Sequence, residues 1–415
     1  MFKLRLCLSC VFCLVSLAHA ATPIKIGLNY PFTGEYKEEG LMQKRGALMA
    51  VAEINAAGGV RGRPLELLER DTHSDADQAR MNVDALAAEG AAMLFGGASS
   101  SVAIAASEQA RRHGLLYFGT LTYSNDTTGK DGHSHMFREC YSAWMAARVL
   151  GEYLKKEMPG KRYFYITADY TWGQTTEASM REFTGTTDVQ EHGAVKVPFP
   201  GARYREIGAA VDAAAKSGAE VIVMVLFGEQ MVQGMTLAEK QGLTQRAQII
   251  VPNLTLSMVE QAGPFIMAGV IGAVPWAWNI PYEREYVRGK QFVEAFSREF
   301  RTRPSSSAAS AYSIVYQWKE AVERAGSLSS DAVRKRLQGH RYQLLKDEQY
   351  WREFDQQNVQ TVYAVKVKDR SLVMKDAYRQ NFFEILHSLP GDKAAPSLAQ
   401  WQEQRQRHQR PLQLE

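Results

Sequence analysis

The chain combines 415 residues with a nearly balanced charge, 49 basic against 45 acidic residues. This balance excludes the strongly basic class of nucleic-acid-binding proteins, and we expect no nucleic-acid partner. The length exceeds what one hydrophobic core usually serves, so it predicts two lobes or domains of ordinary size.

The first twenty residues have the pattern of an export signal. Lys3 and Arg5 precede an apolar run that is too short to cross a bilayer, and Ala18-His19-Ala20 provides a small-x-small cleavage site. We therefore predict a signal peptide at residues 1–20 and a periplasmic mature protein that begins at Ala21.

The cysteines support this assignment. Cys10 would permit lipid attachment as an alternative, but almost no apolar region precedes it. Three of the four cysteines lie in the leader, so the mature chain keeps only Cys140 and can form no intrachain disulfide. We expect Cys140 to be a buried thiol.

From Ile24 onward, short β-branched runs alternate with longer amphipathic stretches. This alternation predicts an α/β fold in which helices cover both faces of a parallel sheet. The strands expected in the first unit are 24–28, 65–70, 92–95 and 115–118, and the helices are 41–57, 76–89 and 99–113.

A second series of the same kind follows the amphipathic stretch 143–157. Its expected strands are 163–167, 195–198, 221–226 and 249–251, and its expected helices are 175–183, 204–217, 229–241 and 255–262. We expect residues 271–279 and the helical stretches 286–300 and 308–325 to complete the first lobe, and the alternating run 362–367 to return to the second.

These elements define the predicted domains. Lobe 1 comprises residues 21–141 and 274–349, and lobe 2 comprises residues 142–273 and 350–385. The remaining residues, 386–415, form a polar tail rich in Gln and Arg, which we expect to be loosely ordered from Gly391.

Loops that follow the strands are the places to look for a site, because ligands of parallel sheets bind beyond the carboxyl ends of the strands. Ser99 and Ser100 begin a helix there, where hydroxyls, free N–H groups and the helix dipole favour a carboxylate. The alternative is an ordinary serine N-cap. Thr120 and Thr122 follow the next strand and can hold an amide or carboxylate, or simply bond their own backbone.

In the second lobe the same reasoning selects four residues. Tyr170 and Trp172 follow a strand and could close over an apolar ligand body, although core packing is an equal alternative. Glu229, at a helix N-terminus, could pair with an ammonium or only stabilise its own helix. Asn253 has the same ambiguity.

An enzyme is a weaker hypothesis. The sequence has no nucleophile elbow, Walker loop or dinucleotide-binding glycine motif after a strand. The segment Asp131-Gly132-His133-Ser134-His135 suggests a metal site, but further ligands at workable spacing are missing, so a polar loop is favoured. We predict a binding protein with no catalytic residue, cofactor or metal.

Several motifs resemble one family. The chain is similar to the branched-chain amino-acid type of periplasmic binding protein, the solute receptor of ABC importers and a relative of urea and short-amide receptors. The resemblance extends to about Lys368, and its most specific marks are Ile24-Lys25-Ile26-Gly27, Pro31-Phe32-Thr33-Gly34, the helix end Glu53-Ile54-Asn55-Ala56-Ala57-Gly58-Gly59-Val60 and Gly62-Arg63-Pro64-Leu65-Glu66-Leu67.

The resemblance implies a two-lobed venus-flytrap fold with three inter-lobe crossovers that closes on its ligand. It implies that Ser99 and Thr122 hold a carboxylate or amide, that the Thr120 carbonyl accepts from an ammonium, and that Trp172 matches the second-lobe aromatic better than Tyr170. The implied partners are an amino acid, amide, urea or small carboxylate and an ABC permease in the inner membrane. A sensor role, with a kinase or chemoreceptor as partner, is the alternative, and the unusual tail keeps it open.

Two departures concern the ligand. The segment Glu35-Tyr36-Lys37-Glu38-Glu39-Gly40 carries more charge than an aliphatic side-chain pocket favours, which argues against leucine-like specificity. Trp276 and Trp278 suggest a larger or flatter ligand, with packing as the alternative.

Overall fold

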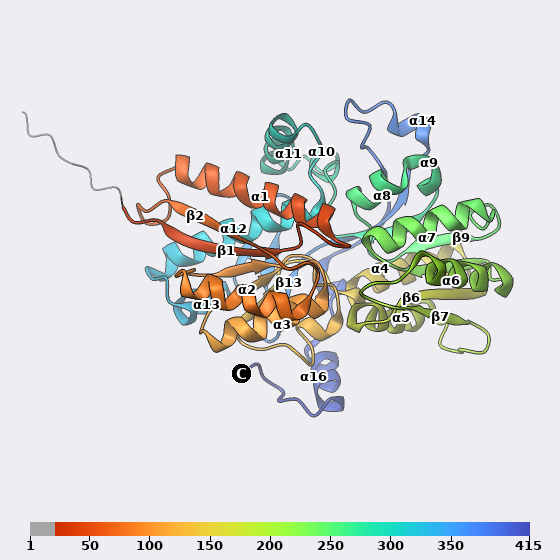
Figure 1. The fold of residues 1–415 in the computed structure, drawn as a ribbon, viewed down its shortest axis with the longest axis horizontal. Helices are drawn as coiled ribbons and strands as arrows, with labels where there is room; N and C mark the ends of the chain where they lie inside the picture. Colours follow the sequence, from red (N-terminus) through yellow and green to blue (C-terminus); the bar gives the residue numbers. More distant parts are fainter. Residues whose placement is uncertain (1–20) are drawn as a thin grey trace, which may run out of the picture.

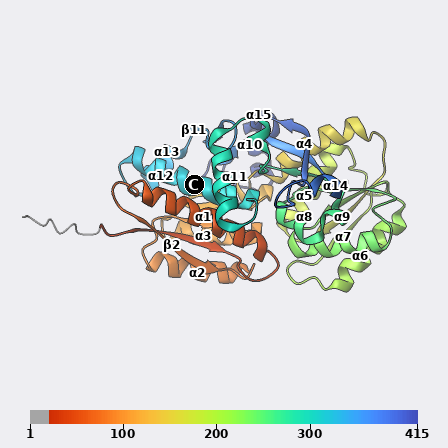
Figure 2. The ribbon, with the colours of Figure 1, turned by 90° about the horizontal axis from the view of Figure 1, so that it is seen from above.

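The computed structural model describes residues 21–415. The predicted signal peptide, residues 1–20, lies outside the described part. The chain folds into two α/β lobes that lie side by side (Figure 1, Figure 2). None of the helices in residues 21–415 is long and apolar enough to cross a membrane.

Lobe 1 is built on a five-stranded sheet with the order β2-β1-β3-β4-β5, in which all neighbouring strands are parallel. Helices α2 and α3 pack together and enclose a small core of their own against this sheet, while α1 packs along α12. The strands are β1 (Ile24–Tyr30), β2 (Leu65–Asp71), β3 (Leu94–Gly96), β4 (Tyr117–Gly119) and β5 (Met136–Arg138), and the helices are α1 (Lys37–Ala56), α2 (Ala76–Ala88), α3 (Ser100–Arg112), η1 (Asn125–Thr127), α11 (Val287–Phe300), α12 (Ser306–Ala325) and α13 (Ser330–Leu337).

The motif at the end of α1 has a clear local role. The Asn55 side chain accepts from the Leu65 amide and donates to the Leu65 carbonyl, which fixes the start of β2. Gly59 has φ +76° and donates its amide to Ile54, and its missing Cβ would lie 2.1 Å from the Arg63 carbonyl oxygen. Glycine is required at this turn because a side chain would collide with the backbone.

Lobe 2 is built on a seven-stranded sheet with the order β15-β14-β10-β9-β8-β6-β7. Strands β6 to β10 are parallel, and β14 and β15 extend the sheet with antiparallel pairing. The strands are β6 (Tyr163–Ala168), β7 (Ala194–Val197), β8 (Val221–Val225), β9 (Gln248–Val251), β10 (Ile271–Val274), β14 (Val362–Val367) and β15 (Phe383–Leu389), and the helices are α4 (Ala143–Glu157), α5 (Thr171–Thr184), α6 (Tyr204–Ser217), α7 (Gly228–Lys240), α8 (Leu256–Ala262), α9 (Pro264–Met267) and α14 (Arg370–Val373).

Three segments join the lobes, as the venus-flytrap architecture requires. They lie between β5 and α4, between β10 and α10 (Ile280–Glu283), and between β13 (Asn358–Val359) and β14. Most buried apolar side chains of both lobes belong to one continuous core.

Two predicted positions within this architecture are corrected. Residues 271–279 were expected to complete the first lobe, whereas the domain bounds placed 271–273 in lobe 2; residues 271–274 are β10 and pair with β9 and β14 in the lobe 2 sheet. Residues 350–359 were expected in lobe 2, but β12 (Gln349–Trp351) and β13 pair with β11 (Arg341–Tyr342) in a separate antiparallel sheet. Trp351 packs edge-on against Phe118 and Phe137 of lobe 1, and burial of this ring holds the small sheet there.

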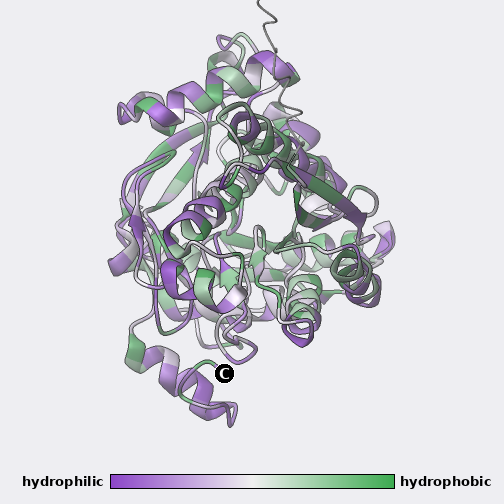
Figure 3. Ribbon diagram, turned by 90° about the vertical axis from the view of Figure 1, so that its left-hand side faces the viewer, coloured by the Kyte–Doolittle hydropathy of each residue, from purple (hydrophilic) through white to green (hydrophobic). Residues whose placement is uncertain are grey.

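The C-terminal tail is also more ordered than predicted. It forms α15 (Gly391–Ala394) and α16 (Leu398–Arg407), and Figure 3 colours most of α16 hydrophilic. The buried Trp401 indole donates to the Thr128 carbonyl, and the Arg405 guanidinium donates to the Gly129 carbonyl. One aromatic anchor and a set of backbone acceptors on lobe 1 therefore order a segment whose composition predicts mobility.

Candidate functional site

The two lobes touch directly along the seam where the carboxyl ends of both parallel sheets meet. The Gly201 amide of lobe 2 donates to Glu35 of lobe 1 over 2.8 Å, and the hydroxyls of Tyr36 and Tyr170 lie 3.2 Å apart. The Thr255 hydroxyl of lobe 2 donates to the Glu39 carboxylate. These cross-lobe contacts show that the lobes are in a closed arrangement.

The loop after β3 provides the first group of hydroxyls at this seam. Gly96 has φ +128°, and a Cβ there would lie 2.3 Å from the Asn29 carbonyl oxygen, so glycine lets the loop pass close to β1. Ser99 is the N-cap residue of α3, but its hydroxyl makes no capping bond and lies 2.8 Å from that of Ser101. Ordinary capping therefore does not account for this serine.

The next residue faces inward. The Ser100 hydroxyl accepts from the Ser124 amide, which ties the loop after β3 to the loop after β4.

The loop after β4 separates the two predicted threonines. The Thr120 hydroxyl donates into the interior of lobe 1, within 2.9 Å of the Gly96 and Gly97 carbonyls, and its own carbonyl accepts from Ser310. The Thr122 hydroxyl lies 2.6 Å from that of Thr127. Both threonines are fully buried, and their side chains organise this loop.

Lobe 2 contributes aromatic rings. Tyr170 stacks on Phe199 with ring centroids 4.1 Å apart, and Trp172 meets Phe227 edge-on at 5.9 Å. Burial raises the pKa of Tyr170, and the nearby Tyr36 and Ser99 hydroxyls oppose this shift. Ser99 and Tyr170, predicted from different lobes, therefore lie together.

The remaining two predicted residues, Asn253 and Glu229, differ in their burial. The Asn253 side-chain oxygen accepts from the Trp172 indole over 3.0 Å and fixes that ring, whereas its amide nitrogen is buried near the Tyr141 hydroxyl. Glu229 is exposed and accepts from Gln233 one turn along α7. It lies on the rim of the seam, outside its interior.

Two residues that the loop argument did not select occupy the middle of the seam. Tyr36 is buried and stacks on Phe199 while meeting Phe227 edge-on, so it joins the lobe 2 aromatic cluster from lobe 1. Glu39, at 2% exposure, accepts from Thr255 of lobe 2 and from Ser307 at the start of α12. The charged segment after Gly34 was the sequence signal for both.

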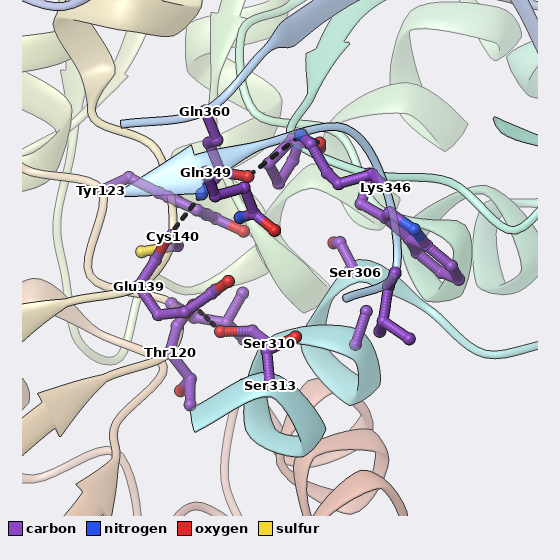
Figure 4. Close-up of a pocket in the computed structure, with 15 residues that line it drawn as sticks. Thr120, Tyr123, Glu139, Cys140, Ser306, Ser310, Ser313, Lys346, Gln349 and Gln360 are labelled. Carbon is purple, nitrogen blue, oxygen red and sulfur yellow. Dashed lines mark hydrogen bonds between the residues drawn. The ribbon is translucent and has the colours of Figure 1, made fainter. Parts of the chain in front are cut away.

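A small cavity of about 20 Å³ lies behind the seam, next to the segments that join the lobes (Figure 4). It has room for about one water molecule. Thr120, Tyr123, Glu139 and Trp276 line it, and Trp276 also packs edge-on against Phe292. Trp278, by contrast, stacks under Arg303 and donates to the Gln380 carbonyl, which is a packing role.

A buried lysine ties the joining segments together beside this cavity. The Lys346 ammonium donates to the carbonyls of Pro275 and Thr361, each over 2.6 Å, and to the Gln360 side-chain oxygen. Gln360 in turn donates to the Glu139 carbonyl. Each of the three crossovers thus contributes an acceptor, and burial lowers the pKa of Lys346 to about 8.

Two further features noted in the sequence, the lone Cys140 and the loop that contains His133, are packed into the fold. Cys140 is buried, and burial raises the pKa of its thiol to about 12. The loop that contains His133 packs under the C-terminus, where the Ser134 amide donates to the Glu415 carbonyl. Burial lowers the pKa of His133 to about 4.

Comparison with known proteins agrees with this architecture. The model of a periplasmic binding protein family matches residues 23–371. The chain is 30% identical over 169 residues to the Leu/Ile/Val-binding protein homolog 4 of Brucella abortus, an alignment that covers 39% of this chain and only 41% of the relative. It is 27% identical over 340 residues to an amino acid binding protein of Pseudomonas aeruginosa, which covers 80% of this chain and 87% of the relative.

The fold has a solved counterpart. A crystal structure of a periplasmic binding protein from Burkholderia mallei superimposes with a TM-score of 0.82 at 23% identity, and the match covers 91% of this chain and 97% of that one. The resemblance inferred from the motifs after β1 and α1 is confirmed. The chain belongs to the type I periplasmic binding proteins of the branched-chain amino acid type.

Proposed function

We propose that this chain is the extracytoplasmic substrate-binding component of an ABC importer and that it captures a small amino-acid-like or amide-like solute between its lobes. The observation that carries the proposal is the direct contact of the two lobes at their strand ends, where the Tyr170 hydroxyl of lobe 2 lies 3.2 Å from the Tyr36 hydroxyl of lobe 1. Ser99, a hydroxyl without a capping role on the loop after a lobe 1 strand, is close enough to Tyr170 to act on its pKa.

The chemistry of this seam suits a small polar solute. Lobe 1 presents the Ser99 hydroxyl and the first amides of α3, which a helix cannot satisfy internally and which favour a carboxylate. Lobe 2 contributes the aromatic rings of Tyr170 and Trp172, with the Asn253 side chain beside Trp172. A ligand that bridges both lobes would favour the closed form over the open form, which is the signal a permease can recognise.

A solute screen tests this proposal. Residues 21–415 are purified and heated in the presence of amino acids, urea and short amides, and small carboxylates, and any stabilising solute is then titrated by calorimetry. A ligand at a hundredfold excess over its dissociation constant should add about 2.7 kcal/mol to the free energy of unfolding. Absence of binding by every solute would contradict the receptor function.

The importer role has its own test. Reconstitution with the cognate permease in liposomes should give uptake of the identified ligand that depends on this protein. Binding without any uptake, together with ligand-dependent activation of a sensor kinase or chemoreceptor, would favour the sensor function instead.

A further inference from the structure

Glu39 is a buried carboxylate at the lobe interface that no basic side chain neutralises. It is 2% exposed, and no Lys, Arg or His nitrogen in residues 21–415 lies within salt-bridge distance of it. Hydroxyls are its partners, from Thr255 across the seam and from Ser307. Burying an uncompensated carboxylate opposes folding, so such a group calls for a functional explanation.

The charge around Glu39 is also uncompensated. Glu35 and Glu139 are two further carboxylates on the lobe 1 side of the seam, and neither forms an ion pair in the described chain. Lys346 is close enough to Glu139 to oppose the rise of its pKa, but its three hydrogen bonds go to the crossovers. Burial raises the pKa of Glu35, Glu39 and Glu139, so the closed seam holds three carboxyl groups whose ionised form a cationic ligand group would stabilise.

A cluster of aromatic rings lies beside the same place. The Tyr123 hydroxyl lies close enough to Glu39 for the carboxylate to contribute to the raised pKa of this phenol. The Tyr123 ring meets Phe227 at 6.0 Å, and Phe227 meets Tyr36 at 5.3 Å. Ring faces attract cations through their quadrupoles, so carboxylate and rings favour the same kind of ligand group.

Two buried polar atoms without a hydrogen-bond partner provide independent information about the region near Glu39. The Ser306 hydroxyl and the Trp276 indole N–H are buried without a partner in the described residues, at 7% and 4% exposure. Both border the small cavity of Figure 4, and both lie with Thr255 along an adjoining crevice. Buried polar groups are normally paired, so these atoms indicate a place where a water molecule or a single polar group of a ligand is held.

We propose that the ligand carries a positively charged group, an ammonium or guanidinium, which lies against Glu39 among the aromatic rings, and that Glu39 sets this preference. The proposal rests on the proposed function of the seam as the solute site. It narrows the ligand to amino-acid-like molecules with a cationic side chain or to amines with a carboxylate at the other end.

Matched pairs of solutes test the preference without any mutation. Residues 21–415 are titrated with lysine and norleucine, with arginine and citrulline, and with 4-aminomethylbenzoate and 4-methylbenzoate. Within each amino-acid pair the second member keeps the α-ammonium and lacks only the side-chain charge, whereas 4-methylbenzoate carries no positive charge at all. We expect the cationic member of at least one pair to bind about 10- to 100-fold more tightly than its neutral counterpart, as for a hydrogen bond to a charged group.

Glu39→Gln then assigns the preference to this residue. The substitution keeps the size and an acceptor oxygen, and it should remove most of the difference within the binding pair. Glu38→Gln is the control, because it makes the same charge change one residue away on a side chain with no cross-lobe contact, and it should leave the difference unchanged.

The outcomes separate the two proposals. Equal or tighter binding of the neutral members, or a cation preference that survives in Glu39→Gln, overturns the role of Glu39. If neutral or anionic solutes bind and Ser99→Ala weakens them, the receptor function stands while this inference fails. If no solute of any class binds, the receptor function itself fails.

Discussion

Two buried ionisable groups, Lys346 at the hinge and Glu39 at the seam, differ in how their charge is compensated. The Lys346 ammonium has three oxygen partners from its own chain and links the crossovers. Within residues 21–415, the hydrogen-bond partners of Glu39 are hydroxyls, one of them on the opposite lobe, and no cation pairs with it. The comparison shows that the polar groups of the hinge are satisfied within the chain, whereas those of the seam remain available to a ligand.

The largest effect should come from breaking the hinge. Lys346→Met removes the donor from the carbonyls of Pro275 and Thr361 and removes the cation nearest Glu139. We expect a loss of about 3 kcal/mol in the free energy of unfolding, measured by urea denaturation, because buried acceptors lose their partner. Lys366→Met, on a partly exposed lysine paired with Glu384, should cost under about 1 kcal/mol, and equal losses would contradict the hinge role.

The next effect concerns the seam. Ser99→Ala removes a hydroxyl that makes no capping bond, so it should weaken the binding of an identified ligand by about 1–2 kcal/mol while leaving the melting temperature nearly unchanged. Calorimetry and thermal unfolding of the same preparation separate these quantities. A large loss of stability with unchanged affinity would show that Ser99 is structural.

A smaller effect sharpens the contrast between the two charges. Burial raises the pKa of Glu39, the Ser307, Thr255 and Ser257 hydroxyls oppose this, and Glu38 adds to it. The folded protein therefore binds this proton more tightly than the unfolded chain, and ionised Glu39 lowers stability once the pH rises above the unfolded value. In the absence of ligand, Glu39→Gln should melt slightly higher than wild type at pH 7.

That difference has a defined pH dependence. It should shrink as the pH falls through the raised pKa of Glu39 and vanish where the carboxyl is protonated in both states. A Glu39→Gln variant that melts lower than wild type at pH 7 would mean that the carboxylate stabilises the closed protein.

The smallest effect is expected at the rim. Glu229 is exposed and bonded to Gln233 within its own helix, so Glu229→Gln should change neither ligand affinity nor stability by more than about 0.5 kcal/mol. Calorimetric titration checks this, and a tenfold loss of affinity would place Glu229 in the site after all.

The sequence supported prediction of the fold more fully than prediction of the site. Alternating β-branched and amphipathic runs identify the strands and helices of both lobes, because burial imposes those periods locally. The position of β12 and β13 could not be predicted in the same way, since it depends on the distant packing of Trp351 on Phe118 and Phe137. The order of α16 depends similarly on carbonyl acceptors more than 270 residues away at Thr128 and Gly129.

The site shows the same limit. Strand ends indicate which loops reach the seam, and that rule selected Ser99, Tyr170 and Trp172, which lie along it. It does not reveal that the Thr120 hydroxyl points into lobe 1 or that Glu229 lies on the rim, because both depend on side-chain partners in three dimensions. For the same reason the sequence could not indicate the role of Glu39, which depends on the lack of a basic side chain beside it in residues 21–415.

Small-angle X-ray scattering of residues 21–415, with and without the solute that stabilises them most, tests the central claim directly. If the solute is captured between lobes that close on it, the radius of gyration should fall on binding, and Ser99→Ala should need a higher solute concentration to reach the same value. An unchanged radius of gyration under saturating solute would contradict capture between closing lobes.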